Sequence, residues 1–108
     1  MMTSKRKLLV FICFALATGV ATAAKYTDDE IGSAISQSDD YSNYQSAFIA
    51  ATRSLAESGR CTLAELKNMG GWVKSQSYKD RPVYFTYCGG MTVKNRIMLD
   101  ASTGRIFK

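Results

Sequence analysis

Few residue types in this chain could do chemistry. Its 108 residues include three cysteines and no histidine. Without an imidazole, serine–histidine and cysteine–histidine catalysis, histidine general bases and most catalytic metal sites are excluded. The nine carboxylates fall at expected helix caps, turns and helix surfaces, where no two are expected to share a substrate cleft. We therefore expect a protein with no enzymatic activity, no cofactor and no metal.

Two of the cysteines, Cys61 and Cys88, are predicted to form a disulfide. Redox catalysis usually uses a close Cys-x-x-Cys pair, and a zinc site needs about four sulfur or nitrogen ligands. This pair is far apart in the sequence, and a bridge would contribute about 3–4 kcal/mol by closing a long loop. The alternative is a thiol-dependent enzyme with two free cysteines. The third cysteine, Cys13, is expected to be an inert apolar residue of the N-terminal segment.

Residues 1–23 have the pattern of a signal peptide. The basic stretch MMTSKRK precedes the apolar run LLVFICFALATGVA, which is shorter than the about 20 residues of a membrane span. The small residues ATA then match a cleavage site. We expect a periplasmic or secreted protein, with one small domain at residues 24–108 and no transmembrane segment after cleavage. An N-terminal membrane anchor is the alternative.

Charge is unevenly distributed along the chain. Residues 1–23 hold three of the 14 basic side chains and none of the nine acidic ones, so the net charge falls from +5 to +2 without them. Residues 24–59 hold two basic and six acidic side chains, whereas residues 60–108 hold nine basic and three acidic ones. Either the two halves neutralise each other, or the second half presents a basic surface to an anionic partner.

The first half of the domain predicts helices. Thr27 with Glu30, and Thr62 with Glu65, have the spacing of capping boxes and predict two short helices. Between them, apolar side chains recur at helical spacing over residues 39–59 and predict the longest helix. This stripe consists of Tyr41, Tyr44, Phe48, Ala51 and Leu55.

The second half predicts strands. Alternating patterns flank the polar triplet KDR and predict a hairpin over residues 72–88, with Trp72 opposite Cys88. A third strand is expected over residues 93–100, and a short fourth strand after the turn DASTG. The predicted fold is α+β, with two or three N-terminal helices followed by a small antiparallel sheet of three to four strands and one disulfide.

This register assigns the sheet residues to two faces. The face expected under the helices carries Val73, Val83, Phe85, Tyr87, Ile97 and Leu99. The face expected to be exposed carries Lys74, Gln76, Tyr84, Thr86, Lys94, Arg96, Met98 and Phe107. A shift of one residue would exchange these lists, and a helix could also cover the second face.

Aromatic side chains ringed by basic ones are typical of protein-binding hot spots. We predict a partner-binding surface at Lys74, Tyr84, Lys94, Arg96, Met98 and Phe107. The leading hypothesis is a non-enzymatic module that recognises another protein, as an inhibitor or immunity-type factor. The alternative is an envelope protein that binds an anionic polymer or lipid head group through its basic C-terminal half. Nucleic acid is not expected as a partner, because an exported protein meets little of it.

The stretch RIMLDASTGRIF resembles the closing strand–turn–strand of PepSY-type domains. These are exported helix-plus-sheet modules linked to protease inhibition. The resemblance is confined to residues 96–107, and neither the cysteine pair nor the GGW segment belongs to the pattern. It implies a binding or inhibitory role rather than catalysis.

Overall fold

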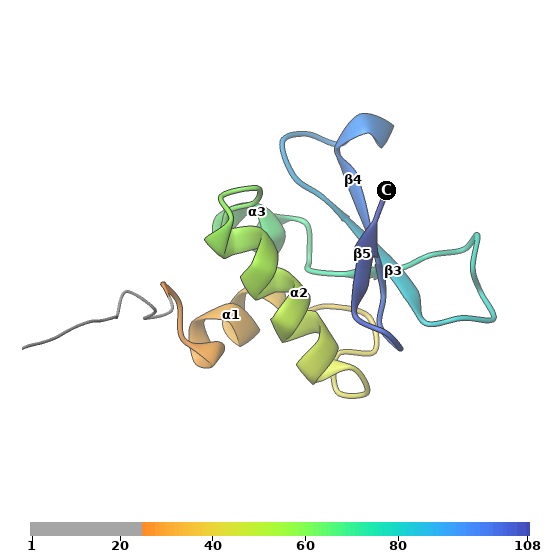
Figure 1. Cartoon of the computed structure of the whole chain (residues 1–108), viewed down its shortest axis with the longest axis horizontal. Helices are drawn as coiled ribbons and strands as arrows, with labels where there is room; N and C mark the ends of the chain where they lie inside the picture. The colour runs from red at the N-terminus through yellow and green to blue at the C-terminus, as the bar shows by residue number, and fades with distance from the viewer. Residues whose placement is uncertain (1–24) are drawn as a thin grey trace, which may run out of the picture.

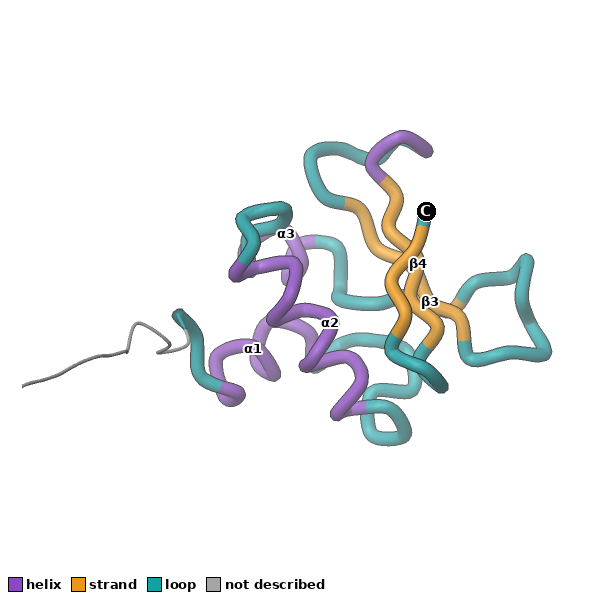
Figure 2. Tube along the Cα trace, in the orientation of Figure 1, coloured by secondary structure: helices purple, strands orange, loops and turns teal. Residues whose placement is uncertain are grey.

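The structure, a computed structural model, describes residues 25–108, so the predicted signal peptide lies outside the described residues. Three helices precede a four-stranded antiparallel sheet, which confirms the α+β fold (Figures 1 and 2). The helices are α1 (Asp28–Ile35), α2 (Gln45–Glu57) and α3 (Leu63–Asn68). The strands, in the spatial order β2-β3-β4-β5, are β2 (Val73–Lys74), β3 (Val83–Tyr87), β4 (Arg96–Asp100) and β5 (Arg105–Phe107); a short 3-10 helix, η1 (Val93–Asn95), precedes β4.

Both predicted capping boxes are present. The Thr27 hydroxyl accepts a hydrogen bond from the Glu30 N–H at 3.1 Å, and the Glu30 carboxylate accepts one from the Thr27 N–H at 2.8 Å. Thr62 and Glu65 repeat this arrangement at the start of α3. These reciprocal bonds satisfy backbone donors that the first turn of a helix leaves free, so short sequences define both helix starts.

The longest helix begins later than its apolar stripe. Asp40 has a φ of 55°, and α2 starts only at Gln45. Tyr41 and Tyr44 therefore precede the regular helix, but their rings still pack on Phe48, at centroid distances of 6.5 and 6.2 Å. The apolar spacing located the packing residues correctly, whereas the turn at Asp40 shortens the helix.

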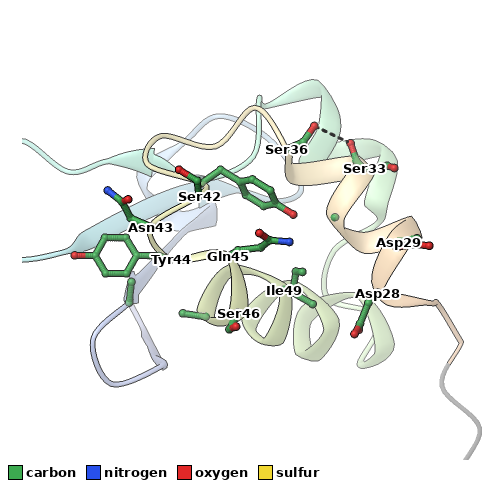
Figure 3. A pocket seen from close by; sticks show the side chains of 14 residues that line it. Asp28, Asp29, Ser33, Ser36, Ser42, Asn43, Tyr44, Gln45, Ser46 and Ile49 are labelled. Atoms are coloured by element: carbon green, nitrogen blue, oxygen red, sulfur yellow. Dashed lines mark hydrogen bonds between the residues drawn. The ribbon is translucent and has the colours of Figure 1, made fainter.

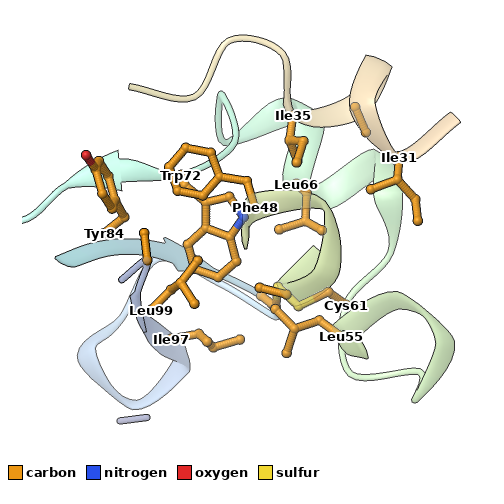
Figure 4. Close-up of a cluster of buried hydrophobic side chains, with 14 residues drawn as sticks. Ile31, Ile35, Phe48, Leu55, Cys61, Leu66, Trp72, Tyr84, Ile97 and Leu99 are labelled. Carbon is orange, nitrogen blue, oxygen red and sulfur yellow. A yellow bond between two sulfur atoms is a disulfide. The ribbon is translucent and has the colours of Figure 1, made fainter. Parts of the chain in front are cut away.

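One hydrophobic core lies between the helices and the sheet (Figure 4). Phe48 of α2 is fully buried, stacks on Trp72 at 6.4 Å and meets the edge of the Tyr84 ring at 5.0 Å. The Trp72 Nε1–H donates to the Thr52 hydroxyl at 3.0 Å, so the buried indole is satisfied within the core. The core thus joins α2 directly to β3 and to the residue before β2.

The predicted disulfide is present. Cys61 precedes α3 and Cys88 follows β3, with their Cα atoms 5.4 Å apart. Both cysteines are buried and belong to the same apolar cluster as Trp72. The bridge therefore ties the helical part of the chain to the sheet.

The predicted strand register was wrong in two places. Val73 lies opposite Phe85 rather than Tyr87, a shift of two residues that keeps Val73 on the same side of the sheet as Phe85. Between β3 and β4, Tyr84 lies opposite Leu99, so the β3 side chains exchange faces relative to the prediction. This is the shift of one residue that transfers every side chain of a strand to the other face of a sheet.

The observed strand register changes which residues face the helices. Tyr84 joins Ile97, Leu99 and Ile106 on the helix-covered side, and Thr86 lies opposite Ile97 on that side. Phe85 and Tyr87, predicted for the core, point to the other side with Arg96 and Met98. Val73, which pairs with Phe85, also lies on that other side and not under the helices as predicted. Val83 is buried as predicted, but it lies on that other side and outside the main cluster.

Candidate functional site

The side of the sheet that faces away from the three helices is the candidate site, and we call it the outer face. The helices lie together on the opposite side of the sheet in Figure 1. The strand pairing aligns side chains of the outer face in two rows: Tyr87 with Arg96, and Phe85 with Met98 and Phe107. The Phe85 and Tyr87 rings contact each other edge to face at 5.7 Å.

A loop over residues 75–82 borders the outer face and forms a groove with it. The groove has a volume of about 440 Å³, and its apolar lining comes from Tyr78, Phe85, Met98 and Phe107. The Tyr78 ring meets Phe107 edge to face at 6.2 Å. The Lys74 ammonium donates to the carbonyl oxygens of Ser75 and Tyr78 at 3.2 and 3.0 Å, which fixes the loop beside the sheet.

Arginines surround these aromatic rings. The Arg105 guanidinium lies 4.4 Å from the Phe107 ring centroid, and Arg81 lies 5.6 Å from that of Tyr78. Arg81 also forms an ion pair with Asp100 at 2.9 Å. Hydrogen bonds from Ser102 and Arg81 lower the pKa of the buried Asp100 carboxyl. The carboxylate therefore stays ionised, and it is bonded to groups of the protein itself. The outer face therefore combines an apolar centre with a basic rim.

The acidic helical part does not neutralise this rim through ion pairs. Among residues 25–108, Arg53 pairs with Asp28 and Glu57 inside the helical part, and Arg81 pairs with Asp100 inside the sheet part. The contacts that acidic residues make across the two parts are instead hydrogen bonds, such as that from the Lys74 N–H to Asp39 at 2.8 Å. The net positive charge of the sheet half is thus available to a partner.

Two predicted site residues do not belong to the outer face. Tyr84 is only 1% exposed, and its hydroxyl donates to the Asp40 carboxylate at 2.7 Å. Burial, together with this hydrogen bond, raises the pKa of Tyr84 well above the usual tyrosine value. Lys74 lies opposite Tyr84 on the same side of the sheet, and its ammonium is engaged by the 75–82 loop. Their predicted exposure on a binding surface is therefore wrong.

The other predicted residues are brought near one another. Arg96, Met98 and Phe107 share the outer face, and Phe107 lies directly opposite Met98 as expected. Lys94 is exposed in η1, just before β4. Sequence reasoning missed Tyr78, Phe85, Tyr87 and Arg105. Cys88 could have indicated the correct side for Phe85 and Tyr87. A cysteine that is bonded to the start of a helix must point to the helix-covered side of the strand. Alternation along β3 puts Tyr84 on that same side and Phe85 on the other.

A second concave region lies on the helical part, between α1, the 41–47 segment and α2 (Figure 3). This cleft has a volume of about 1030 Å³ and is lined mainly by polar side chains, including Asp29, Ser33, Asn43 and Gln45. No lysine or arginine of the described residues lines it. Its hydroxyl, amide and carboxylate groups could hydrogen-bond a neutral polar molecule, but they offer no cationic group to an anionic one.

The described part of the chain contains neither a cluster of metal ligands nor a helix that could span a membrane. Residues 25–108 contain no group of three histidine, cysteine or acidic side chains close enough to hold a metal ion. In the same residues, no helix has the length and apolar character needed to cross a membrane.

Comparison with protein-family models, with curated proteins and with solved structures gives no match. The resemblance of residues 96–107 to PepSY-type domains therefore gains no support from the rest of the chain.

Proposed function

We propose that this protein is an exported, non-enzymatic binding module whose outer face recognises another protein, as an inhibitor or immunity-type factor does. The observation that carries this proposal is the groove between the 75–82 loop and the sheet. It is apolar at its centre, about 440 Å³ in volume, and bordered by arginines. Aromatic residues and arginine are the types most enriched at the centres of protein interfaces.

The chemistry of the groove defines the partner. An apolar side chain of the partner would fill the space between Tyr78, Phe85 and Met98. Carboxylates beside that side chain would pair with Arg96 and Arg105, since no acidic residue within 25–108 forms an ion pair with either arginine. The proposed partner is therefore a protein with an acidic surface and a protruding apolar residue. An anionic polymer would pair with the arginines but would leave the groove unfilled.

Site-specific photo-crosslinking in the native cell tests this proposal. A photo-reactive amino acid would replace Gln76, which is exposed and lines the groove. The matched control position is Ala50, which is exposed on α2. We expect a discrete protein adduct from position 76 and none from position 50. Equal adducts from both positions, or none from position 76, would contradict a protein-binding outer face.

The identified partner then allows a quantitative test with purified proteins. Phe107→Ser combined with Arg96→Glu should weaken binding at least a hundredfold, because loss of an aromatic anchor and reversal of an adjacent charge each cost more than a tenfold factor. Arg60→Glu, a charge reversal in the exposed turn before α3, is the control and should leave affinity unchanged. Binding that disappears in high salt in the unmodified protein would favour the anionic polymer instead.

Export is a separate part of the proposal with its own measurement. Intact mass of the protein from the native cell should correspond to a chain that begins at Ala24. Alkylation should modify no cysteine before reduction and two after it. A mass that retains residues 1–23 would instead indicate an N-terminal anchor.

A further inference from the structure

The segment between β3 and β4 exposes two large apolar side chains. Met91 and Val93 are 73% and 71% exposed, and they are the large hydrophobic residues of the described chain that stand open to solvent. Both belong to residues 89–95, which we call the 89–95 loop. Figure 1 shows this loop at the end of the sheet near which the chain terminates.

Hydrogen bonds hold the 89–95 loop in one conformation. The Gly89 N–H donates to the Glu65 carboxylate at 2.9 Å. The hydrogen bond from the Thr62 N–H and this bond lower the pKa of Glu65. The Asn95 side-chain amide donates to the Gly89 carbonyl at 3.2 Å and to the Thr92 hydroxyl at 3.1 Å. Cys88, immediately before the loop, is fixed by the disulfide. The apolar side chains are therefore presented by an ordered loop, which loses little conformational entropy when it binds.

Basic side chains gather at the same end of the sheet. Lys94 follows Val93 directly, and the Lys108 ammonium donates to the Lys94 carbonyl. Arg96 begins β4 next to the loop. Within residues 25–108, the carboxylate that hydrogen-bonds to the loop is that of Glu65, and it already accepts from the N–H groups of Gly89 and Thr62. The tip is thus apolar, and its surroundings are positively charged.

We infer that the 89–95 loop docks this protein on an anionic lipid bilayer, with Met91 and Val93 inserted at the boundary between head groups and acyl chains. Lys94 and Lys108 would contact lipid phosphates. Two apolar side chains close together on an exposed loop can both enter the apolar part of a bilayer. The basic side chains beside them are attracted to an anionic leaflet. This inference goes beyond the proposed protein partner, because Met91 and Val93 do not line the groove, whereas Lys108 borders both surfaces.

Vesicle co-sedimentation tests the inference with the protein purified in the form that the native cell accumulates. We expect binding to equimolar phosphatidylglycerol and phosphatidylcholine vesicles, and much weaker binding to phosphatidylcholine alone. Met91→Ser with Val93→Ser should weaken partitioning about a hundredfold, because each apolar side chain contributes about a tenfold factor. Lys94→Gln should weaken it about fivefold. Because these positions are exposed, all variants should keep the unfolding midpoint of the parent protein.

Two control variants separate the possible outcomes. Lys79→Gln removes an exposed base in the 75–82 loop, away from the tip, and should leave vesicle binding unchanged. Phe107→Ser in the groove should also leave it unchanged, so failure of the protein-binding proposal would be distinguishable. The inference is overturned if the parent protein ignores anionic vesicles. It is equally overturned if Lys79→Gln weakens binding as much as Lys94→Gln, or if the double serine variant loses a protein partner and still binds vesicles.

Discussion

The two faces of the sheet contain similar residue types, but these residues are buried on one face and partly exposed on the other. On the helix-covered face, Tyr84 and Leu99 are at most 1% exposed and pack around Phe48. On the outer face, Phe85, Tyr87 and Phe107 remain partly exposed and have arginines beside them. Aromatic content alone therefore does not distinguish core from surface in this protein. The helices that cover one side and the charges that border the other make the difference.

The polar groups of the two faces differ in the same way. In the core, the Trp72 indole and the Tyr84 hydroxyl each bond to a fixed partner on the helical part of the chain. At the outer face, Arg105 lies on an aromatic ring and has no carboxylate partner within residues 25–108. Fixed partners stabilise the fold, whereas exposed unpaired cations suit recognition of an anionic surface.

The largest expected effect is that of truncating Phe48 in the core, and it is compared with truncation of Phe107 on the outer face. Phe48→Ala should lower the free energy of unfolding by about 3–5 kcal/mol, because it leaves a cavity among four aromatic rings. Phe107→Ala should cost less than about 1.5 kcal/mol, since its ring is partly exposed. Urea denaturation measures both. Equal losses would show that the outer face is part of the core.

Removal of the disulfide is the next largest perturbation. Cys61 and Cys88 are 27 positions apart, so Cys61→Ala with Cys88→Ala should cost about 3–4 kcal/mol. The bridge joins the helical part to the end of β3 and to the start of the 89–95 loop. Hydrogen exchange in the double variant should therefore increase most around Cys88, and in β5 least. A uniform increase would contradict this local role.

Tyr84→Phe removes a hydroxyl without removing the ring from the core. The lost bond to the Asp40 carboxylate should cost about 1.5 kcal/mol at neutral pH. The folded-state pKa of Tyr84 is raised, so its contribution is complete below the unfolded-state value of about 10 and declines as the pH rises above it. The parent protein should consequently lose more stability above pH ~10 than the Tyr84→Phe variant does. Parallel pH profiles from urea titration would refute the raised pKa.

The smallest expected effect is a gain in stability. The Thr86 hydroxyl is buried on the helix-covered face and has no hydrogen-bond partner among residues 25–108. Thr86→Val replaces it with a group of the same shape, which removes the cost of an unsatisfied polar atom and should stabilise the fold by about 1 kcal/mol. The matched change Thr103→Val, in the exposed turn before β5, should bring no gain. A loss at Thr86 would mean that its hydroxyl finds a partner in solution.

Much of the fold could be predicted from local patterns. The capping boxes at Thr27 and Thr62 each depend on four consecutive residues, so the starts of α1 and α3 followed from the sequence. The spacing around Phe48 likewise identified the residues that pack in the core. The disulfide followed from cysteine count and separation. The faces of β3 did not, because VYFTYC alternates between two sets that are both largely apolar.

The candidate site was predicted in part for the same reason. Arg96, Met98 and Phe107 were placed together, because residues two apart in a strand share a face and the turn after β4 brings Phe107 opposite Met98. Tyr84 was misplaced because alternation along β3 cannot distinguish two apolar faces. Met91 was missed, since nothing in a short loop sequence indicates whether an apolar side chain is buried or exposed. Val93 was missed because it was expected to begin the third strand, whereas it lies in η1.

Local patterns and composition were enough to predict the starts of α1 and α3, the link between Cys61 and Cys88, the order of helices before strands and the concentration of basic charge in the second half. These properties depend on residues that are close in the chain or on composition. The folded structure was needed to show which side of the sheet the helices cover, that no ion pair of residues 25–108 joins the two halves, and that Met91 and Val93 are exposed. These properties depend on contacts between segments far apart in sequence, which burial and packing select together.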